Sequence, residues 1–287
     1  MTTPKHANDD GENGRYYTDP RSGDLLISVT NALQQLAKPA LAPAAATETV
    51  KYMMANLDQA AGAMADPFER AQFEKAARAA YRDLWDTKAH LGTRVHHLAE
   101  SHVLDRPAAP DPEAEPFVDQ YRRFLAEAGI DILRDVEAAE VTVLNRTLGY
   151  GGTADLWVHL RQPPESWGVE PGLWLIDAKT SLTKLPSVVY AEYPLQLAAL
   201  RYAETALDAL DGEHPVPEFV GTAVLNLRAD RYGFVPLPGD EQAFEAFTHI
   251  TATSRYVHAL DLKPYKPVND WKYKPGQKKA KASEVAA

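Results

Sequence analysis

The spacing of apolar residues divides the chain into a mainly helical first part and a second part that contains strands. Between about 47 and 128, apolar residues recur at three- and four-residue intervals, which is typical of helices that bury one face. The pattern also predicts a short strand or arm after residue 15 and a short helix at about 28–37. Four helices are expected between 47 and 128: the second begins at the capping pair Asp66-Pro67, the third covers about 92–104 and the fourth covers about 113–127.

The apolar spacing changes to every second residue from about 137, which indicates strands. Alternating positions surround Val141 and Leu156, and the glycines at 149, 151 and 152 indicate a turn or a close backbone approach between them. Further along, we expect a Pro/Gly loop at 162–172, strands at 173–178, 220–226 and 231–235, and helices at 187–209 and about 239–259. This order predicts an α/β fold with a central mixed β-sheet flanked by helices, plus an N-terminal helical region.

The composition is that of a soluble globular protein. Of the 287 residues, 45% are hydrophobic and 24% are charged. No apolar run approaches the roughly 18 residues of a transmembrane helix, and the polar N-terminus is unlike a secretory signal, so the expected location is cytoplasmic and no membrane partner is expected. The expected organisation is a disordered segment at 1–14, a single domain at 15–262 (mainly helical over 15–130, sheet-containing over 131–262) and a basic flexible tail at 263–287.

The residue types limit the chemistry that is available. The chain has no cysteine, which excludes disulfides, thiolate zinc sites, cysteine nucleophiles and iron–sulfur clusters. A metal ion would therefore bind to Asp, Glu, His or backbone carbonyls, a set that favours hard cations such as Mg²⁺ or Mn²⁺.

The most informative polar residues lie on two neighbouring predicted strands. Asp155 follows Gly151-Gly-Thr-Ala, whereas Asp177 and Lys179 stand at the end of the next apolar strand. Because side chains alternate along a strand, Asp177 and Lys179 project from the same face. Two carboxylates on adjacent strands can bind one divalent cation, and a lysine beside them can hold a water molecule or stabilise the charge of a phosphate. A strand end with ordinary surface charges is the alternative.

Two further groups fit such a site. His96 and Glu100 are four residues apart on a predicted helix and so share one face, where both could reach a metal ion; a surface pair is the alternative. Gln196 lies on the apolar face of a later helix, where its amide could orient a water molecule or could only satisfy the backbone. His97 points about 100° away from His96 and is expected to be exposed or structural.

In this order, the motifs resemble those of the PD-(D/E)XK nuclease superfamily, specifically its RecB-like branch. The chain has Gly-Thr-x-x-His-x-x-x-Glu at 92–100, Gly-Thr-Ala-Asp at 152–155, Ile-Asp-Ala-Lys-Thr at 176–180 and Gln-Leu at 196–197. The branch includes CRISPR-associated RecB-like exonucleases and bacteriophage recombination exonucleases. The segments Ile27-Ser-Val-Thr30 and Lys38-Pro-Ala-Leu41 also look like those of the phage-type members. The resemblance covers about residues 15–235 and implies a restriction-endonuclease-like core.

The resemblance also implies roles for individual residues. His96, Asp155 and Asp177 would be metal ligands together with the Ala178 carbonyl, Lys179 would position and activate the attacking water, Glu100 would bind or orient the metal, and Gln196 would orient the water or the lysine. Glu140 matches an acidic position of the family. DNA contacts are expected from Arg201 and Tyr202, although the tyrosine that the family often carries four residues after the glutamine is replaced here by Leu200.

The activity that the resemblance implies is Mg²⁺- or Mn²⁺-dependent exonucleolytic hydrolysis of DNA in phage or bacterial recombination or replication. The substrate would be linear DNA with ends, and a recombinase or a single-strand-binding protein would be a partner. The CRISPR-associated members usually hold an iron–sulfur cluster through cysteines, so a chain without cysteine is more similar to the phage-type members. A non-catalytic DNA-binding or assembly module and a structure-specific endonuclease are the alternatives.

The charge is distributed unevenly along the chain. The net charge is −10, but seven lysines and two acidic residues give residues 263–287 a charge of +5, which leaves −15 for the rest. Aromatic residues alternate with lysines in this tail, and Trp271, Lys272 and Lys274 are expected to contact nucleic acid. A tail that only increases solubility is the alternative.

Overall fold

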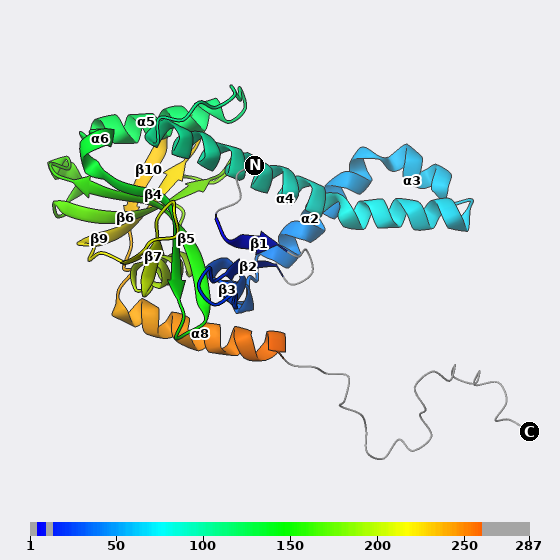
Figure 1. Cartoon of the computed structure of the whole chain (residues 1–287). Helices are drawn as coiled ribbons and strands as arrows, with labels where there is room; N and C mark the ends of the chain where they lie inside the picture. Colours follow the sequence, from blue (N-terminus) through cyan, green and yellow to red (C-terminus); the bar gives the residue numbers. More distant parts are fainter. Residues whose placement is uncertain (1–4, 10–13, 260–287) are drawn as a thin grey trace, which may run out of the picture.

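The fold is mixed α/β, with a curled mixed sheet and helices on both of its faces (Figure 1). The computed structural model describes residues 5–9 and 14–259. The strands are β1 (Ala7–Asp9), β2 (Arg15–Thr18), β3 (Leu25–Ser28), β4 (Val136–Asn145), β5 (Tyr150–Leu160), β6 (Gly172–Thr180), β7 (Thr205–Leu207), β8 (Glu213–Pro215), β9 (Gly221–Leu227) and β10 (Tyr232–Pro236). The helices are α1 (Val29–Ala32), α2 (Leu41–Ala55), α3 (Leu57–Ala63), α4 (Pro67–Val103), α5 (Glu115–Glu127), α6 (Ile132–Asp135), α7 (Glu192–Arg201) and α8 (Glu241–Ala259), with 3-10 turns at Leu33–Gln35 and Glu165–Trp167.

The strand β5 organises the sheet because it pairs with three other strands. It is antiparallel to β4, antiparallel to β6 through residues 156–160, and parallel to β3 through residues 150–151. Between the β3 and β6 pairings, residues 152–155 of β5 therefore pair with neither strand. The sheet opens at this point, and the candidate site lies there.

Hydrophobic packing places helices on the two faces of the sheet. On one face, the second half of α4 and α5 pack against β5, β6 and β9, with Phe117 and Phe124 among the buried side chains. On the other face, α1, α7 and α8 pack around Tyr150 and Phe247. Since β6 and β9 are covered on both faces, they consist of nearly continuous apolar residues rather than an alternating pattern.

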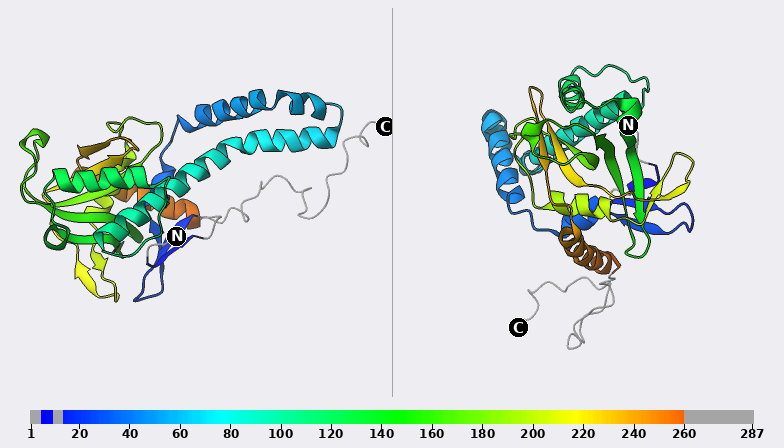
Figure 2. Two further views of the ribbon diagram at one scale, coloured as in Figure 1. Left: turned by 90° about the horizontal axis from the view of Figure 1, so that it is seen from above. Right: turned by 90° about the vertical axis from the view of Figure 1, so that its left-hand side faces the viewer.

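The first half of α4 leaves this body and forms a helical hairpin with α2 and α3 (Figure 2). The hairpin has a small core of its own, in which Phe73 and Ala77 of α4 contact Ala63 of α3 and the partly buried Tyr52 of α2. Asp66 caps α4 as expected, because its side chain accepts a hydrogen bond from the Phe68 amide at 2.7 Å.

Several sequence-based boundaries were wrong. The second and third predicted helices are one helix, α4, because the single Gly92 does not interrupt a helix that is packed on both sides of it. The helix expected at 187–209 covers only Glu192–Arg201, and the following residues form β7 and β8. Residues 1–14 are expected to be disordered, but Ala7–Asp9 forms β1 and pairs with β2. The basic tail, with Trp271, Lys272 and Lys274, lies outside the described residues.

Candidate metal centre

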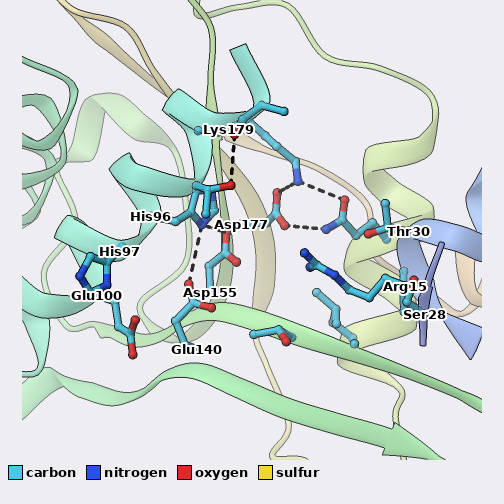
Figure 3. A pocket seen from close by; sticks show the side chains of 18 of the residues that line it. Arg15, Ser28, Thr30, His96, His97, Glu100, Glu140, Asp155, Asp177 and Lys179 are labelled. Atoms are coloured by element: carbon cyan, nitrogen blue, oxygen red, sulfur yellow. Dashed lines mark hydrogen bonds and ion pairs between the residues drawn. The ribbon is translucent and has the colours of Figure 1, made fainter. Parts of the chain in front are cut away.

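The opening in the sheet leads into a cavity of about 360 Å³ that is lined by charged and polar side chains from several elements (Figure 3). His96 comes from α4, Glu140 from β4 and Asp155 from β5. Asp177 and Lys179 come from β6, and Gln196 from α7. Except for Ala178, each residue to which the sequence assigned a part in metal binding or catalysis contributes to the lining of this cavity.

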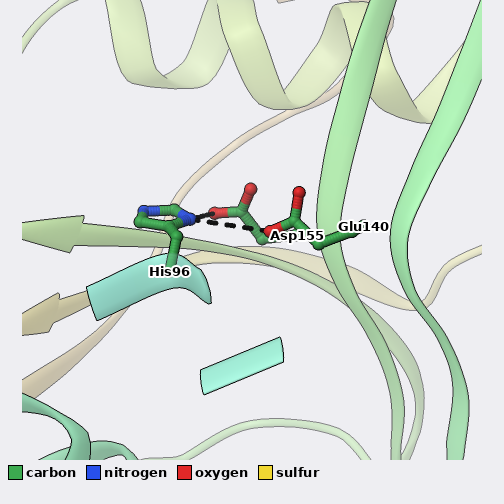
Figure 4. Close-up of side chains that lie close together, drawn as sticks. All are labelled: His96, Glu140 and Asp155. Atoms are coloured by element: carbon green, nitrogen blue, oxygen red, sulfur yellow. Dashed lines mark ion pairs between the residues drawn. The ribbon is translucent and has the colours of Figure 1, made fainter. Parts of the chain in front are cut away.

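Three of these side chains converge on one point and form a possible metal-binding cluster, which consists of His96, Glu140 and Asp155 (Figure 4). One potential ligand atom of each lies within 4.8 Å of the other two. The Nδ1 atom of His96 is 3.5 Å from a carboxylate oxygen of Asp155 and 3.7 Å from one of Glu140. Two carboxylates and an imidazole suit a hard or borderline divalent cation.

Backbone groups of Ala178 fix two members of this cluster. The Nε2 atom of His96 donates a hydrogen bond to the Ala178 carbonyl at 3.0 Å, which turns Nδ1 towards the carboxylates. The Ala178 amide donates to Asp155 at 2.7 Å. Ala178 therefore orients two ligand residues instead of adding its carbonyl oxygen to the cluster, which differs from the expected role.

The backbone at Glu140 is strained, which marks this residue as unusual. Its φ of 52° is in the left-handed region, which a glutamate rarely adopts. The register between β4 and β5, in which Val141 pairs with Ala154 and Ala139 with Leu156, sets Glu140 opposite Asp155. Two carboxylates directly opposite each other on neighbouring strands repel, and a cation between them removes that cost.

The electrostatics of the cluster reflect this crowding. Burial disfavours the charged imidazole of His96, but Asp155 and Glu140 outweigh this and raise its pKa to about 9. The pKa of Asp155 is also raised, first by burial and then by the Glu140 carboxylate, despite the opposing effect of His96. The charged imidazole of His96 thus offsets part of the repulsion between the two carboxylates.

A second group of side chains, Asp177, Lys179 and Gln196, lies beside the cluster. The ammonium group of Lys179 is 2.6 Å from Asp177 and donates a hydrogen bond to Gln196 at 3.1 Å. The amide of Gln196 donates in turn to Asp177 at 2.8 Å. The Lys179 ammonium also lies 5.5 Å from the centre of the Tyr193 ring, which fixes its position further.

Asp177 is the most deeply buried carboxylate of the site, with a side chain that is 2% exposed. Burial raises its pKa to about 6, although Lys179 lowers it. Burial also disfavours the charge of Lys179, but Asp177 and Asp155 outweigh this, so the pKa of the lysine is raised. Asp177 was expected to be a metal ligand, but it points to Lys179 and Gln196 and is not part of the cluster.

Other expected residues lie away from the cluster. Glu100 lines the cavity one helical turn from His96, but its carboxylate accepts a hydrogen bond from Arg106 at 3.1 Å. Arg201 donates hydrogen bonds to the carbonyls of Phe219 and Gly239, and Tyr202 packs against Phe244 of α8. Neither Arg201 nor Tyr202 lines the cavity, and their contacts hold α7 in place, so the DNA contacts expected of them are not supported.

The sequence-based reasoning missed the wall that the N-terminal segment provides. Arg15, Tyr17, Ser28 and Thr30 line the cavity because β3 pairs with β5 in parallel. The hydroxyl of Tyr17 is 2.7 Å from that of Thr153, which attaches the wall to β5. The resemblance had singled out the segment Ile27–Thr30 without giving it a role, and the two-residue spacing of Arg15 and Tyr17 puts both on one face of a strand.

A second overlooked residue is His97, which was expected to be exposed or structural but also lines the cavity, next to His96 on α4.

Among the described residues, no helix combines the length and the apolar character that crossing a membrane requires. The sequence matches no protein-family model and none of the curated proteins, so the functional argument rests on the geometry of the site.

Proposed function

We propose that this protein is a divalent-metal-dependent DNA exonuclease with a PD-(D/E)XK core of the RecB-like kind that has no iron–sulfur cluster. One observation carries the proposal. Three separate parts of the chain, α4, the β4–β5 hairpin and β6, bring His96, Glu140, Asp155 and Lys179 into one cavity. An imidazole, two carboxylates and an adjacent ammonium group are the parts that metal-assisted phosphodiester hydrolysis requires.

The donor set of the cluster fits Mg²⁺ or Mn²⁺. His96, Glu140 and Asp155 would hold the ion, and the imidazole favours Mn²⁺ over Mg²⁺ because nitrogen ligands suit transition metals. The repulsion between the two opposed carboxylates and the absence of cysteine from the chain support a hard cation as the occupant. When bound, the cation would neutralise charge on the phosphate and make a coordinated water more acidic.

The protein's own groups around the cluster would position the substrate and the attacking water. Lys179 can donate a hydrogen bond to a water molecule or to a phosphate oxygen, and its ammonium group is held in place by Asp177 and Gln196. A fixed ammonium group beside a reacting phosphate stabilises the negative charge that develops there. Arg15, on the opposite wall of the cavity, adds a cation that can bind a second phosphate oxygen.

The shape of the cavity favours action at a strand end. Residues of the β2–β3 hairpin, α4 and α7 line the cavity around the cluster, so the cluster is recessed between these elements. A strand end enters such a cavity more easily than the middle of a duplex does. This supports an exonuclease over a structure-specific endonuclease, which must place a continuous strand across its catalytic residues.

Cleavage of end-labelled linear DNA tests the proposal. Single- and double-stranded substrates would be incubated with Mg²⁺, Mn²⁺ or EDTA, for the wild type, Lys179→Ala and the control Lys184→Ala, which changes an exposed lysine just beyond β6. We expect metal-dependent release of mononucleotides by the wild type and the control, and none by Lys179→Ala.

Covalently closed circular DNA, included in the same experiment, separates the alternatives. If the wild type cuts the circle, the protein is an endonuclease. If it binds DNA but cuts neither form with either metal, the non-catalytic binding module is correct. Equal activity of Lys179→Ala and the wild type would contradict the role assigned to the lysine.

A further inference from the structure

The helix α4 connects the candidate metal centre to the projecting helical hairpin without a break. It covers Pro67–Val103, and its residues His96, Thr93, Gly92 and Ala89 line the cavity. In a helix with 3.6 residues per turn, the same face continues towards the hairpin through residues 85, 82 and 78. The face of α4 that points into the cavity therefore extends beyond it along the hairpin.

This extension carries aromatic and cationic side chains. Trp85 and Tyr81 make an edge-to-face contact with ring centres 4.9 Å apart. The guanidinium group of Arg82 lies 5.6 Å from the centre of the Tyr81 ring and donates a hydrogen bond to its hydroxyl. One turn further on, Arg78 is 79% exposed, and its nearest carboxylate, Glu74, is 3.4 Å away. We call Arg78, Tyr81, Arg82 and Trp85 the α4 stripe.

The packing of the hairpin does not account for the stripe. The buried residues of α4 in this region are Phe73 and Ala77, which face α2 and α3. At 100° per residue, they lie roughly a third of a turn from the line that joins His96 to Arg78. Trp85 and Tyr81 are only partly buried, and Arg82 is exposed. Large aromatic side chains that remain accessible beside cations, in a protein whose net charge is −10, suggest a ligand that is both planar and anionic.

The residues between the stripe and the metal centre are small. An added Cβ at Gly92 would meet no atom within 4 Å, and Ala89 is exposed. A polymer backbone can therefore lie close to α4 between Trp85 and His96. At 1.5 Å per residue, Trp85 and His96 are separated by about 16 Å along the helix axis. At the B-form rise of ~3.4 Å, this corresponds to about five nucleotides of one strand, and to fewer if the strand is extended.

We propose that the α4 stripe binds single-stranded DNA and guides the strand to the metal centre. Trp85 stacks on a base, and Arg82 and Arg78 bind phosphates further along the strand, on the side of Trp85 that is away from the metal centre. Stacking on aromatic side chains together with a row of cations is how single strands are bound without sequence preference. A duplex would bind weakly, because its bases are not available for stacking. That the bound strand leads to the metal centre rests on the proposed function, whereas binding of single-stranded DNA to the α4 stripe does not.

Binding of a fluorescein-labelled oligothymidylate to the full chain in EDTA tests the stripe without any cleavage. We expect Trp85→Leu to weaken binding about tenfold, within the range for loss of one base stack, and Trp85→Phe to retain most of it. Each of Arg78→Ala and Arg82→Ala should reduce the slope of log affinity against log salt by about 0.7.

Matched controls show whether such losses are specific. Lys184→Ala removes an exposed cation that lies outside α4, in the loop after β6, and Tyr256→Ala removes an exposed aromatic residue of α8. Both should bind like the wild type, with unchanged circular dichroism and melting temperature in every variant. Equal affinity of Trp85→Leu and the wild type, or tighter binding of a duplex than of the single strand, would overturn the proposal.

Hydrolysis of the p-nitrophenyl ester of thymidine 5′-monophosphate, with Mn²⁺, separates this proposal from the proposed function. The ester reaches the cavity but not Trp85, so we expect Trp85→Leu to hydrolyse it at the wild-type rate. If the wild type binds the oligonucleotide through Trp85 but hydrolyses neither ester nor DNA, the proposed function is wrong and the stripe stands. If Trp85→Leu loses ester hydrolysis while its fold is intact, the stripe is instead part of the metal centre, and the proposal fails.

Discussion

Metal binding at the candidate centre should depend on pH because of the proton on His96. The two carboxylates raise the pKa of His96 to about 9, so at pH 7 only about 1% of the imidazole is neutral. A metal ion can bind only to the neutral ring, so binding must release the proton. This competition weakens binding at pH 7 by about 3 kcal/mol relative to a pH well above 9. Between pH 7.0 and 8.5, the affinity for Mn²⁺ should therefore rise about 25-fold.

Isothermal titration calorimetry can measure both the affinity and the proton. Titrating Mn²⁺ at pH 7.0 in two buffers with different ionisation enthalpies gives the number of protons released, which should be close to one per ion. The same titrations at pH 7.5, 8.0 and 8.5 should show a gain in affinity of about eight- to ninefold per pH unit, decreasing towards pH 9. Asp177 contributes little to this slope, because its pKa of about 6 lies below the range.

The control is His96→Gln, which offers a ligand oxygen but no titrating ring. Its affinity for Mn²⁺ should be lower and independent of pH over the same range. The reasoning is refuted if wild-type affinity is constant from pH 7.0 to 8.5, or if no proton is released at pH 7.0. Either result would mean that His96 does not ligate the ion or is already neutral without it.

Three further substitutions test other parts of the structure. Lys179→Met should reduce the single-turnover rate of DNA hydrolysis at saturating Mn²⁺ at least about a hundredfold, because it removes the ammonium group and keeps the length of the side chain. Gly152→Ala should cost about 1–3 kcal/mol in urea unfolding, since the added Cβ would lie 2.6 Å from a methyl group of the buried Leu200. Asp19→Asn should cost about 2 kcal/mol at pH 7, because the ion pair with Arg146 lowers the pKa of Asp19 to about 2. The stabilisation that ionised Asp19 provides is complete above about pH 4 and is lost as the pH falls through 2. The difference in free energy of unfolding between the wild type and Asp19→Asn, measured with urea, should therefore be smaller at pH 3 than at pH 7.

Much of the secondary structure followed from periodicity, and the errors occurred where periodicity has no information. Gly92 was taken as a boundary between two helices, but packing of α4 on both sides of it outweighs the roughly 1 kcal/mol that glycine costs. The strands β1, β7 and β8 have three residues each, which is too short for an alternating pattern to be recognised. β1 and β7 form because the longer strands β2 and β4 offer free backbone hydrogen-bonding groups, and β8 then pairs with β7, so all three depend on the assembled sheet.

The candidate site was predictable in its residue types but not in its grouping. Alternation along β6 places Asp177 and Lys179 on one face, as the sequence implied. Which carboxylates meet His96 depends on the register between β4 and β5, which brings Glu140 opposite Asp155. The turn between Asn145 and Tyr150 sets that register, which the alternation of apolar residues alone does not reveal. Arg15 was missed for a similar reason, because it reaches the cavity only through the pairing of β3 with β5.

The free-energy cost of these side-chain and backbone arrangements argues against the alternative of a non-catalytic binding module, in which the site would have lost its use. Glu140 adopts a left-handed backbone conformation, which costs of order 1 kcal/mol or more for a residue of this type. It also faces Asp155 across the strands, and Asp177 is 2% exposed beside them, so that burial raises the pKa of both aspartates. Substitution of these residues by neutral ones would relieve the strain and the repulsion, and mutation would readily supply such changes if no function opposed them. The backbone strain, the repulsion between carboxylates and the burial of the aspartates all occur within one cavity. Lys179 lies beside them and is held in place by Asp177 and Gln196. Binding of a cation would remove the repulsion between the carboxylates. The strain and the repulsion at these residues therefore support the proposed metal centre.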